Sequence, residues 1–460
     1  MTAGKTTISA GRAARLWLIF AAALAIRWGY VLAIHAMLGA QGLQGVDSIS
    51  FLIQAEHQAA AFHAGGLSGW GWVGSNTIVM PLFVWILTAC HLIAGSSTAL
   101  AYVLLQGILD AGTCVLVYRL AATFNPAFAM PAAVAAVINP TQIVLSGLVY
   151  NDTPFLLFAT LALLAALWWL QRPAFSTALL LGVALGAAAL TRVMIVPAIP
   201  VLLVFLLAAL AIMQRLRRAH LGQLAAAAVI AALCLAPTLI RNAKDYDAWS
   251  LTSQGGQHLA FWIVPLVQEA KDGTPWSQGY EAMQQRVKAR YPTMSGNPFL
   301  HSAQLEAVGR EEITALGVGA MAKAWLLGAA INLASPALVL SPIVSALPRT
   351  GFYATQGAST LEKIRNFLFA TDNALYAWIL ITGIAGLIVM RCVQLAGLPG
   401  MLRSGHWPGV LLLGGWCVYV LLVNGPIASP KYRLPMESTF ALLTGAGFIA
   451  LRRLVSRSRQ

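Results

Sequence analysis

Charged residues are scarce in this chain of 460 residues: Asp, Glu, Lys and Arg together make up 10% of it. A soluble domain usually carries about 25% charged residues. With so few charges and 59% hydrophobic residues, the chain cannot cover its surface with groups that water solvates well. Most of that surface must therefore face lipid, which excludes an ordinary soluble protein.

Motifs of soluble enzymes and of metal sites are lacking as well. The five cysteines lie in apolar stretches and form no CxxC pair, so neither a disulfide framework nor a cysteine metal site is expected. P-loop, HExxH and GxSxG motifs are absent, which argues against ATP-driven and soluble-hydrolase chemistry. The net charge of +14 lies on no soluble basic patch, so nucleic-acid binding is not expected. Cytoplasmic loops rich in Lys and Arg explain this charge best, and attraction to anionic lipids is the second explanation.

Long apolar segments recur along the whole chain, and most are long enough to cross a hydrocarbon core of roughly 30 Å as a helix. Unbroken apolar runs favour helices over barrel strands, so we expect an all-α polytopic membrane protein with about 10–12 transmembrane helices. Segments 78–94 and 321–347 are ambiguous, the second because Pro336 and Pro342 interrupt it. The expected segments lie near 16–38, 78–94, 98–120, 127–148, 153–170, 176–190, 193–213, 221–240, 321–347, 373–391, 408–424 and 436–451.

Basic residues at both ends of the chain indicate the topology. Lys5 and Arg452 lie in basic end segments and place both termini in the cytoplasm, so the loop 39–77 and the short loop before the last span should lie outside. We predict three parts. These are an N-terminal transmembrane catalytic module (1–240, with the first outer loop 39–77), a periplasmic loop region (241–320) and a C-terminal membrane region (321–460).

Acidic residues near the membrane are candidate functional residues, because the chain has only fifteen Asp and Glu and a charge in lipid is costly. Asp47 precedes an apolar run, so it suits either a helix N-cap or a general base. Asp152 precedes Thr-Pro and has the same two interpretations. Asp110 lies within a span, where a polar contact between helices is favoured over a functional role.

Cations near the membrane also have two interpretations each. Arg27 could extend to the interface or neutralise an anion, and the sequence favours neither. Lys431-Tyr432-Arg433 opens the last span, where two cations and an aromatic ring suit a lipid phosphate. Ordinary interfacial anchoring is at least as good an explanation of this tripeptide taken alone.

At these residues the chain resembles the GT-C superfamily of integral-membrane glycosyltransferases, especially the protein O-mannosyltransferases and lipid A aminoarabinose transferases. Three positions depart from the family pattern: Phe51 replaces Tyr, Ser48 replaces a second acidic or small residue, and Lys431 replaces Arg. The matching elements, in order, are Asp47 with Phe51 and Ala55, Pro140 with Asp152-Thr153-Pro154, Leu190-Thr191-Arg192, Arg241-Asn242 with Ser253-Gln254-Gly255-Gly256-Gln257-His258-Leu259, and Lys431-Tyr432-Arg433-Leu434-Pro435.

The resemblance implies transfer of a sugar from a polyprenyl-phosphate donor to an acceptor hydroxyl at the periplasmic face of the bacterial inner membrane. It implies Asp47 as general base and Asp152 as a second catalytic carboxylate. It also implies a set of residues that bind the donor phosphate: Arg192, Arg241, Lys431, Tyr432 and Arg433. Gly255, Gly256 and His258 would shape the cavity.

The expected partners are the polyprenyl-phosphate sugar, membrane lipids, and a lipid, glycan or protein acceptor, with no nucleic acid. No cofactor is assigned, and use of a divalent metal by Asp47, Asp152 and outer-loop histidines is left open because no ligand spacing argues for it. A transporter or flippase of a lipid-linked or small anionic substrate is the alternative. It would predict inverted repeats, and the sequence contains no internal repeat. A non-catalytic scaffold of the same fold is a third hypothesis.

Overall fold

The computed structural model describes residues 3–70, 76–370 and 373–457, and every regular element in them is a helix, which confirms the all-α class. Of the predicted outer loop 39–77, residues 71–75 lie outside the described part. The helices are α1 (Ala3–Leu38), α2 (Ser48–Trp70), α3 (Pro81–Ala94), α4 (Thr98–Phe124), α5 (Pro126–Val137), α6 (Pro140–Ser146), α7 (Asp152–Gln171), α8 (Phe175–Thr191), α9 (Ala198–Ile212), α10 (Arg218–Tyr246), α11 (Gly255–His258), α12 (Val264–Asp272), α13 (Trp276–Arg290), α14 (Pro298–Leu316), α15 (Val318–Ala334), α16 (Pro342–Ser345), α17 (Thr360–Phe369), α18 (Ala374–Leu402), α19 (Trp407–Asn424) and α20 (Glu437–Arg457).

Many of these helices have the length and composition of membrane spans. Among the described residues, eight helical segments qualify, or up to ten if each of two bent helix pairs counts as one span. Ten is the lower end of the predicted range. The ambiguous segment 78–94 is α3, which a short turn joins to α4 in one apolar stretch, Pro81–Phe124. The chain is therefore an integral membrane protein.

Two pairs of consecutive helices are each sharply bent at a short break. The predicted segment 127–148 is wrong as a single helix, because α5 and α6 meet at 47°. Asn139 causes the break: its side chain accepts from the backbone N–H groups of Thr141 and Gln142, while Pro140 takes the first helical position. α14 and α15 meet at 101°. α15 ends at Ala334, just before the Ser335-Pro336 break expected from the sequence.

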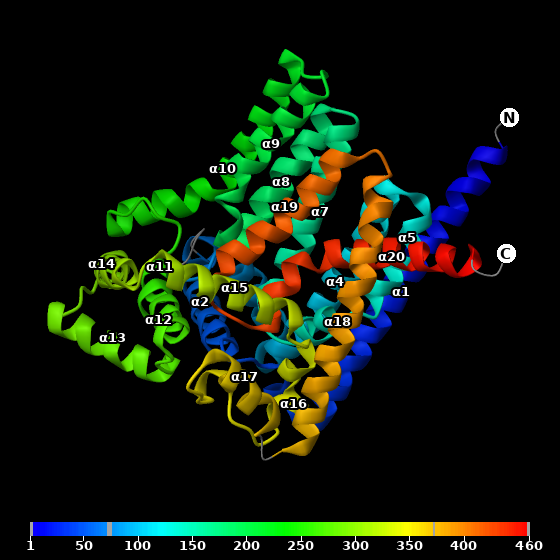
Figure 1. The fold of residues 1–460 in the computed structure, drawn as a ribbon. Helices are drawn as coiled ribbons and strands as arrows, with labels where there is room; N and C mark the ends of the chain where they lie inside the picture. Colours follow the sequence, from blue (N-terminus) through cyan, green and yellow to red (C-terminus); the bar gives the residue numbers. More distant parts are fainter. Residues whose placement is uncertain (1–2, 71–75, 371–372, 458–460) are drawn as a thin grey trace.

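Both chain termini lie on one side of the helical bundle, and α12, α13, α14 and α17 lie on the opposite side (Figure 1). α1 has 36 residues, so at 1.5 Å per residue it is about 54 Å long and carries the chain across the bundle. α20 runs back toward the side of the termini. The end of α1 and the start of α20 therefore share the side opposite the termini.

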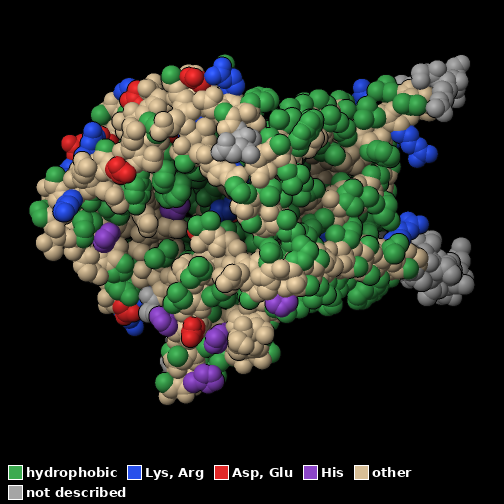
Figure 2. Space-filling model, turned by 90° about the horizontal axis from the view of Figure 1, so that it is seen from below, with side chains coloured by type: hydrophobic (Ala, Val, Ile, Leu, Met, Phe, Trp, Pro, Cys, Tyr) green, Lys and Arg blue, Asp and Glu red, His purple; other side chains and the backbone are tan. Residues whose placement is uncertain are grey.

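Charged side chains follow this division. Figure 2 shows hydrophobic side chains crowding the middle of the molecule, Lys and Arg beside the chain ends, and mixed charges at the far end. Outward-facing apolar residues such as Val201 (66% exposed) and Leu326 (73% exposed) would face water in a soluble protein. The structure thus has an apolar belt between two polar ends, as a lipid bilayer requires.

A buried polar cluster joins α1, α4 and α6 inside the bundle. Arg27 Nε donates to Asp110 Oδ2 at 2.7 Å, and both side chains are almost fully buried (0% and 1% exposed). Arg27 also donates to the carbonyls of Val137 and, at 2.9 Å, Ala136, while Gln142 Nε2 donates to Asp110 Oδ1 at 2.9 Å. Asp110 thus makes the predicted contact between helices, and Arg27 neither extends to the interface nor faces an external anion.

Small residues let α8 and α10 pack closely side by side. A Cβ at Gly182 would come 2.7 Å from the Ala227 carbonyl oxygen, and one at Gly186 would come 2.6 Å from Cys234 Sγ. The partners advance along both helices together, so α8 and α10 run parallel. Their C-terminal ends, with Arg192 and Arg241, therefore lie on the same side of the bundle.

Candidate active site

The predicted base Asp47 and the predicted cation Lys431 are in direct contact. Asp47 lies immediately before α2, and Lys431 lies in a 3₁₀ helix, η7 (Pro430–Met436), that leads into α20. Lys431 Nζ donates to Asp47 Oδ2 at 2.9 Å. The Asp47 side chain is 47% exposed and that of Lys431 is 20% exposed, so a molecule from solvent can reach the pair.

Asp152 and Arg192 form a second ion pair. Asp152 opens α7 and is buried, while Arg192 directly follows α8 and keeps 18% of its side chain exposed. Asn151 Nδ2 donates to the Thr191 carbonyl at 3.2 Å, which ties the start of α7 to the end of α8. The Arg192 guanidinium also lies 5.8 Å from the centre of the Phe155 ring. The ion pair and the Asn151 contact thus both hold the start of α7 against the end of α8. Arg192 is the more exposed residue of the pair.

Tyr150 links these two ion pairs. Its ring centre lies 5.0 Å from Lys431 Nζ, and its side chain is 6% exposed. Burial raises the pKa of the Tyr150 hydroxyl, the charge of Lys431 lowers this pKa, and the charges of Asp47 and Asp152 raise it. Because carboxylates of both pairs act on one hydroxyl, the pairs form a single cluster.

His258, at the end of α11, faces the same cluster. Burial lowers the pKa of its imidazole, the positive charges of Arg192 and Lys431 lower this pKa further, and Asp47 raises it. The imidazole is therefore neutral at pH 7. The structure thus brings together Asp47, Asp152, Arg192, Lys431 and His258, which the sequence places far apart.

Arg433 points away from this cluster, although it is two residues from Lys431. Its side chain is 1% exposed and pairs with Glu437 at 2.7 Å. It also donates to Thr141 Oγ1 at 2.8 Å and to the carbonyls of Asn332 and Ser335 at 3.0 and 2.7 Å. These contacts fix η7 to α6 and to the end of α15. A phosphate contact of Arg433 therefore has no support in this geometry.

The other predicted site residues take varied positions. Tyr432 lies beside Lys431, whose Nζ is 5.4 Å from its ring centre. Arg241 donates to the Asn76 carbonyl at 2.7 Å and so holds the end of the first outer loop.

The two predicted cavity glycines also differ from each other. Gly256 is buried, its N–H donates to Ser302 Oγ at 3.0 Å, and an added Cβ would overlap the Ser302 carbonyl. Its role is thus close packing of α11 on α14. Gly255 is exposed and has open space around it.

An open apolar groove of about 440 Å³ has Val193, the residue that follows Arg192, in its wall. Its walls come from the turn after α8, from α10, from the loop 249–252 and from the end of α19. Residues that line it include Val193, Val196, Pro197, Leu239, Leu251 and Val423. A partly exposed cation therefore adjoins, in the sequence, a surface that suits a hydrocarbon chain.

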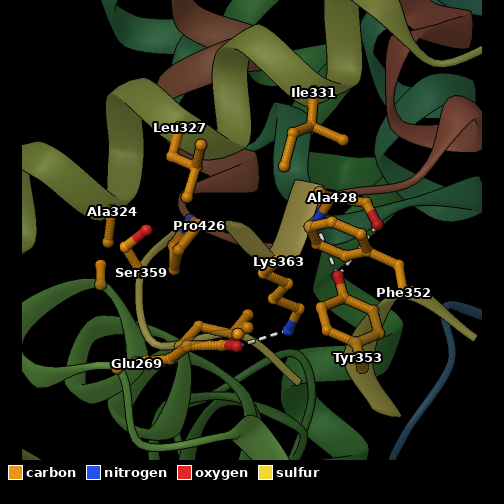
Figure 3. Close-up of a pocket in the computed structure, with 14 residues that line it drawn as sticks. Glu269, Ala324, Leu327, Ile331, Phe352, Tyr353, Ser359, Lys363, Pro426 and Ala428 are labelled. Atoms are coloured by element: carbon orange, nitrogen blue, oxygen red, sulfur yellow. Dashed lines mark hydrogen bonds and ion pairs between the residues drawn. The ribbon is translucent and has the colours of Figure 1, made fainter. Parts of the chain in front are cut away.

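A second, narrower pocket lies behind the loop that carries Lys431 (Figure 3). Tyr353 Oη accepts from the Ala428 N–H at 3.0 Å and donates to the Ala428 carbonyl at 2.9 Å. Lys363, in α17, forms an ion pair with Glu269 of α12 and lies 4.7 Å from the centre of the Phe352 ring. Burial raises the pKa of Glu269, and Lys363 opposes this rise. Tyr353 thus holds Ala428, in the loop before Lys431, and the Lys363–Glu269 pair holds α17 to α12.

The ion pair in this pocket gives a testable stability prediction. Lys363→Met should leave the partly buried Glu269 without its counter-charge, at a cost of about 2 kcal/mol for a lost hydrogen bond between charged groups. Amide hydrogen exchange of residues 352–369 should accelerate in consequence. The double variant Lys363→Met/Glu269→Leu should recover most of the protection. Equal exchange in the single variant and the wild type would mean that the pair does not hold α17.

Residues 79–240 match the model of the dolichyl-phosphate-mannose-protein mannosyltransferase family. This match confirms the predicted resemblance to GT-C glycosyltransferases. The matched region carries Asp152, Arg192 and half of the residues that line the groove next to Arg192. Asp47, His258 and Lys431 lie outside the matched region.

Two solved structures of ArnT from Cupriavidus metallidurans are also similar to the chain, each at 16% identity. The apo structure gives a TM-score of 0.36 and covers 91% of this chain and 76% of its own. The structure bound to undecaprenyl phosphate gives 0.39 and covers 95% and 78%. Scores of this size carry no inference about individual residues. A search of curated proteins finds no match.

Sequence reasoning missed three residues that organise this site. Tyr150 lies in the Tyr150-Asn151-Asp152 element, but only the carboxylate of Asp152 indicated a function in the sequence. Tyr353 gave no signal because its partner Ala428 lies 75 positions away in the sequence. Glu437 gave none because the sequence left open whether Arg433 binds a phosphate or anchors the helix. Among the described residues, no group of three or more His, Cys, Asp or Glu is placed to hold a metal ion, and Asp47 and Asp152 have cation partners instead.

Proposed function

We propose that the protein transfers a sugar from a polyprenyl phosphate to an acceptor hydroxyl at the periplasmic face of the inner membrane. The observation that carries this proposal is the convergence of two carboxylate–cation pairs, Asp47–Lys431 and Asp152–Arg192, next to an apolar groove. The site lies opposite both basic chain ends, which supports an outward-facing site by the positive-inside rule.

The donor would place its lipid chain in the groove and its phosphate near Arg192 and Lys431. A phosphate carries negative charge that a guanidinium fork and an ammonium can both neutralise. The leaving group of the reaction is itself a phosphate, so this charge stabilisation supports bond cleavage without a proton donor.

Asp47 would act as general base once donor is bound. Lys431 Nζ donates to the Asp47 carboxylate at 2.9 Å and so occupies the oxygen that would accept the proton. An incoming phosphate would draw Lys431 toward itself and free Asp47. The acceptor hydroxyl would then give its proton to Asp47 while its oxygen forms the new bond to the anomeric carbon. The bond from that carbon to the phosphate oxygen breaks, releasing polyprenyl phosphate and inverting the anomeric centre.

Asp152 would act through Arg192. It is buried, so its ion pair would hold the guanidinium in place and leave the exposed part of Arg192 for phosphate. His258, neutral at pH 7, would line the space between the cations and accept or donate a hydrogen bond to a sugar hydroxyl.

The decisive experiment uses the full-length protein in lipid nanodiscs with a panel of polyprenyl-phosphate sugars and lipid, glycan and peptide acceptors. Wild-type protein should release polyprenyl phosphate and form one labelled product. Lys431→Met should raise the Kd for the donor about tenfold or more, since a charge-assisted hydrogen bond is lost. Lys288→Met, on the exposed face of α13, is the matched control and should leave this Kd unchanged.

Two outcomes would overturn the proposal in different ways. Movement of donor between leaflets without any product would favour the flippase alternative. An unchanged donor Kd in Lys431→Met, with transfer intact, would remove Lys431 from the phosphate site.

A further inference from the structure

We propose that Tyr150 is a positioning residue that sets the place of both Asp47 and Lys431. This inference rests on the proposed function and assigns a role to a side chain that binds no substrate. It combines two contacts of one buried ring: the hydroxyl holds the turn that carries Asp47, and the ring face lies against Lys431.

The turn before α2 is fastened to the loop before α7. Val149 N–H donates to the Leu43 carbonyl at 3.0 Å, and Ser48 Oγ donates to the Val149 carbonyl at 2.8 Å. Ser48 Oγ also accepts from Gly45 N–H at 2.8 Å. These contacts set the distance between the two loops, but none of them acts on the residue directly before Asp47.

The Tyr150 hydroxyl supplies that contact. It accepts a hydrogen bond from Val46 N–H at 3.1 Å, so it fixes the peptide next to Asp47. Gly45 allows the approach, because any Cβ there would overlap the hydroxyl. Tyr150 is itself rigid: it is buried, and Tyr102 Oη donates to its carbonyl at 2.8 Å. A fixed hydroxyl therefore determines where the exposed Asp47 carboxylate points.

The ring of Tyr150 has a separate effect on Lys431. An ammonium about 5 Å from an aromatic face is attracted by the ring quadrupole. The ring thus offers Lys431 a resting position that does not depend on Asp47. When phosphate draws the ammonium away from the carboxylate, the ring still keeps Lys431 within the site.

Two variants separate the two effects. Tyr150→Phe removes the hydroxyl and keeps the ring, so kcat should fall about tenfold while the KM for the donor stays within about twofold. Tyr150→Leu removes both, so the donor KM should also rise by about fivefold. Amide exchange at Val46 should accelerate in both variants. Tyr118→Phe, a buried tyrosine on the cytoplasmic half of α4, is the matched control and should keep wild-type kcat and KM.

The outcomes distinguish this inference from the proposed function. If the wild type transfers sugar and Tyr150→Phe has wild-type kcat, Tyr150 does not position Asp47. If Tyr150→Phe and Tyr150→Leu have the same donor KM, the ring does not support Lys431. If the wild type transfers sugar from none of the polyprenyl-phosphate donors, the proposed function fails, and amide exchange at Val46 in Tyr150→Phe still tests whether Tyr150 holds the turn before Asp47.

Discussion

Replacing Asp47 by Asn should lower kcat at least about 100-fold, because general-base catalysis contributes 10²–10⁴ to a rate. The amide keeps the size of the side chain and can still contact Lys431 through its oxygen. It cannot accept the proton of the acceptor hydroxyl. The donor Kd should therefore change little, and loss of the charge on residue 47 should if anything make Lys431 more available to phosphate. Single-turnover transfer in nanodiscs, together with donor binding, measures both quantities.

The matched control for this prediction is Asp272→Asn. Asp272 is an exposed aspartate at the end of α12, and its Oδ1 accepts from Thr274 N–H at 3.0 Å, a contact that asparagine can keep. This variant should retain wild-type turnover. Transfer at the wild-type rate by Asp47→Asn would show that another group removes the proton, and the neutral His258 would be the first to examine.

Much of the fold follows from apolar run length alone. The predicted segments 98–120, 153–170 and 408–424 correspond to α4, α7 and α19 within a few residues, because one long apolar run can bury its backbone only as a helix in lipid. The bend between α5 and α6 does not follow from run length, because apolar segments continue beyond it in both directions. Asn139-Pro140 is the sequence signal for it, since Asn139 caps the helix that Pro140 opens.

The sequence predicts which residues belong to the candidate site, but it does not predict which of them pair with each other. The sequence places Asp47 and Lys431 at the same membrane face, yet 384 positions separate them, and their contact depends on how α1 and α20 each pack against α4 and α5. Lys431 and Arg433 look equivalent in the sequence. The turn of η7 sends Lys431 toward Asp47 and sends Arg433 into the bundle, where Glu437 pairs with it. Residue type predicts a cation, and only the local backbone decides which way it faces.

Removing the charge of Asp110 should be among the most destabilising single changes in the chain. Asp110→Asn leaves the Arg27 guanidinium buried without a counter-charge, and breaking a buried ion pair in this way costs about 3–5 kcal/mol. Gln142, which donates to the same carboxylate, would have to reorganise as well. The free energy of unfolding in mixed detergent micelles, followed by circular dichroism, measures this loss.

The double variant Arg27→Met/Asp110→Leu tests whether the cost comes from the uncompensated charge. Replacement of a buried pair by apolar residues is often close to neutral, so the double variant should recover most of the stability that either single change removes. Thr113→Val, on the same helix three residues from Asp110, is the matched control. In the described part of the chain its hydroxyl donates only to the Leu109 carbonyl of its own helix, so its loss should cost under about 1 kcal/mol. If Asp110→Asn proves as mild as Thr113→Val, the Arg27–Asp110 pair does not hold α1 to α4, and packing of the apolar side chains around it must do so.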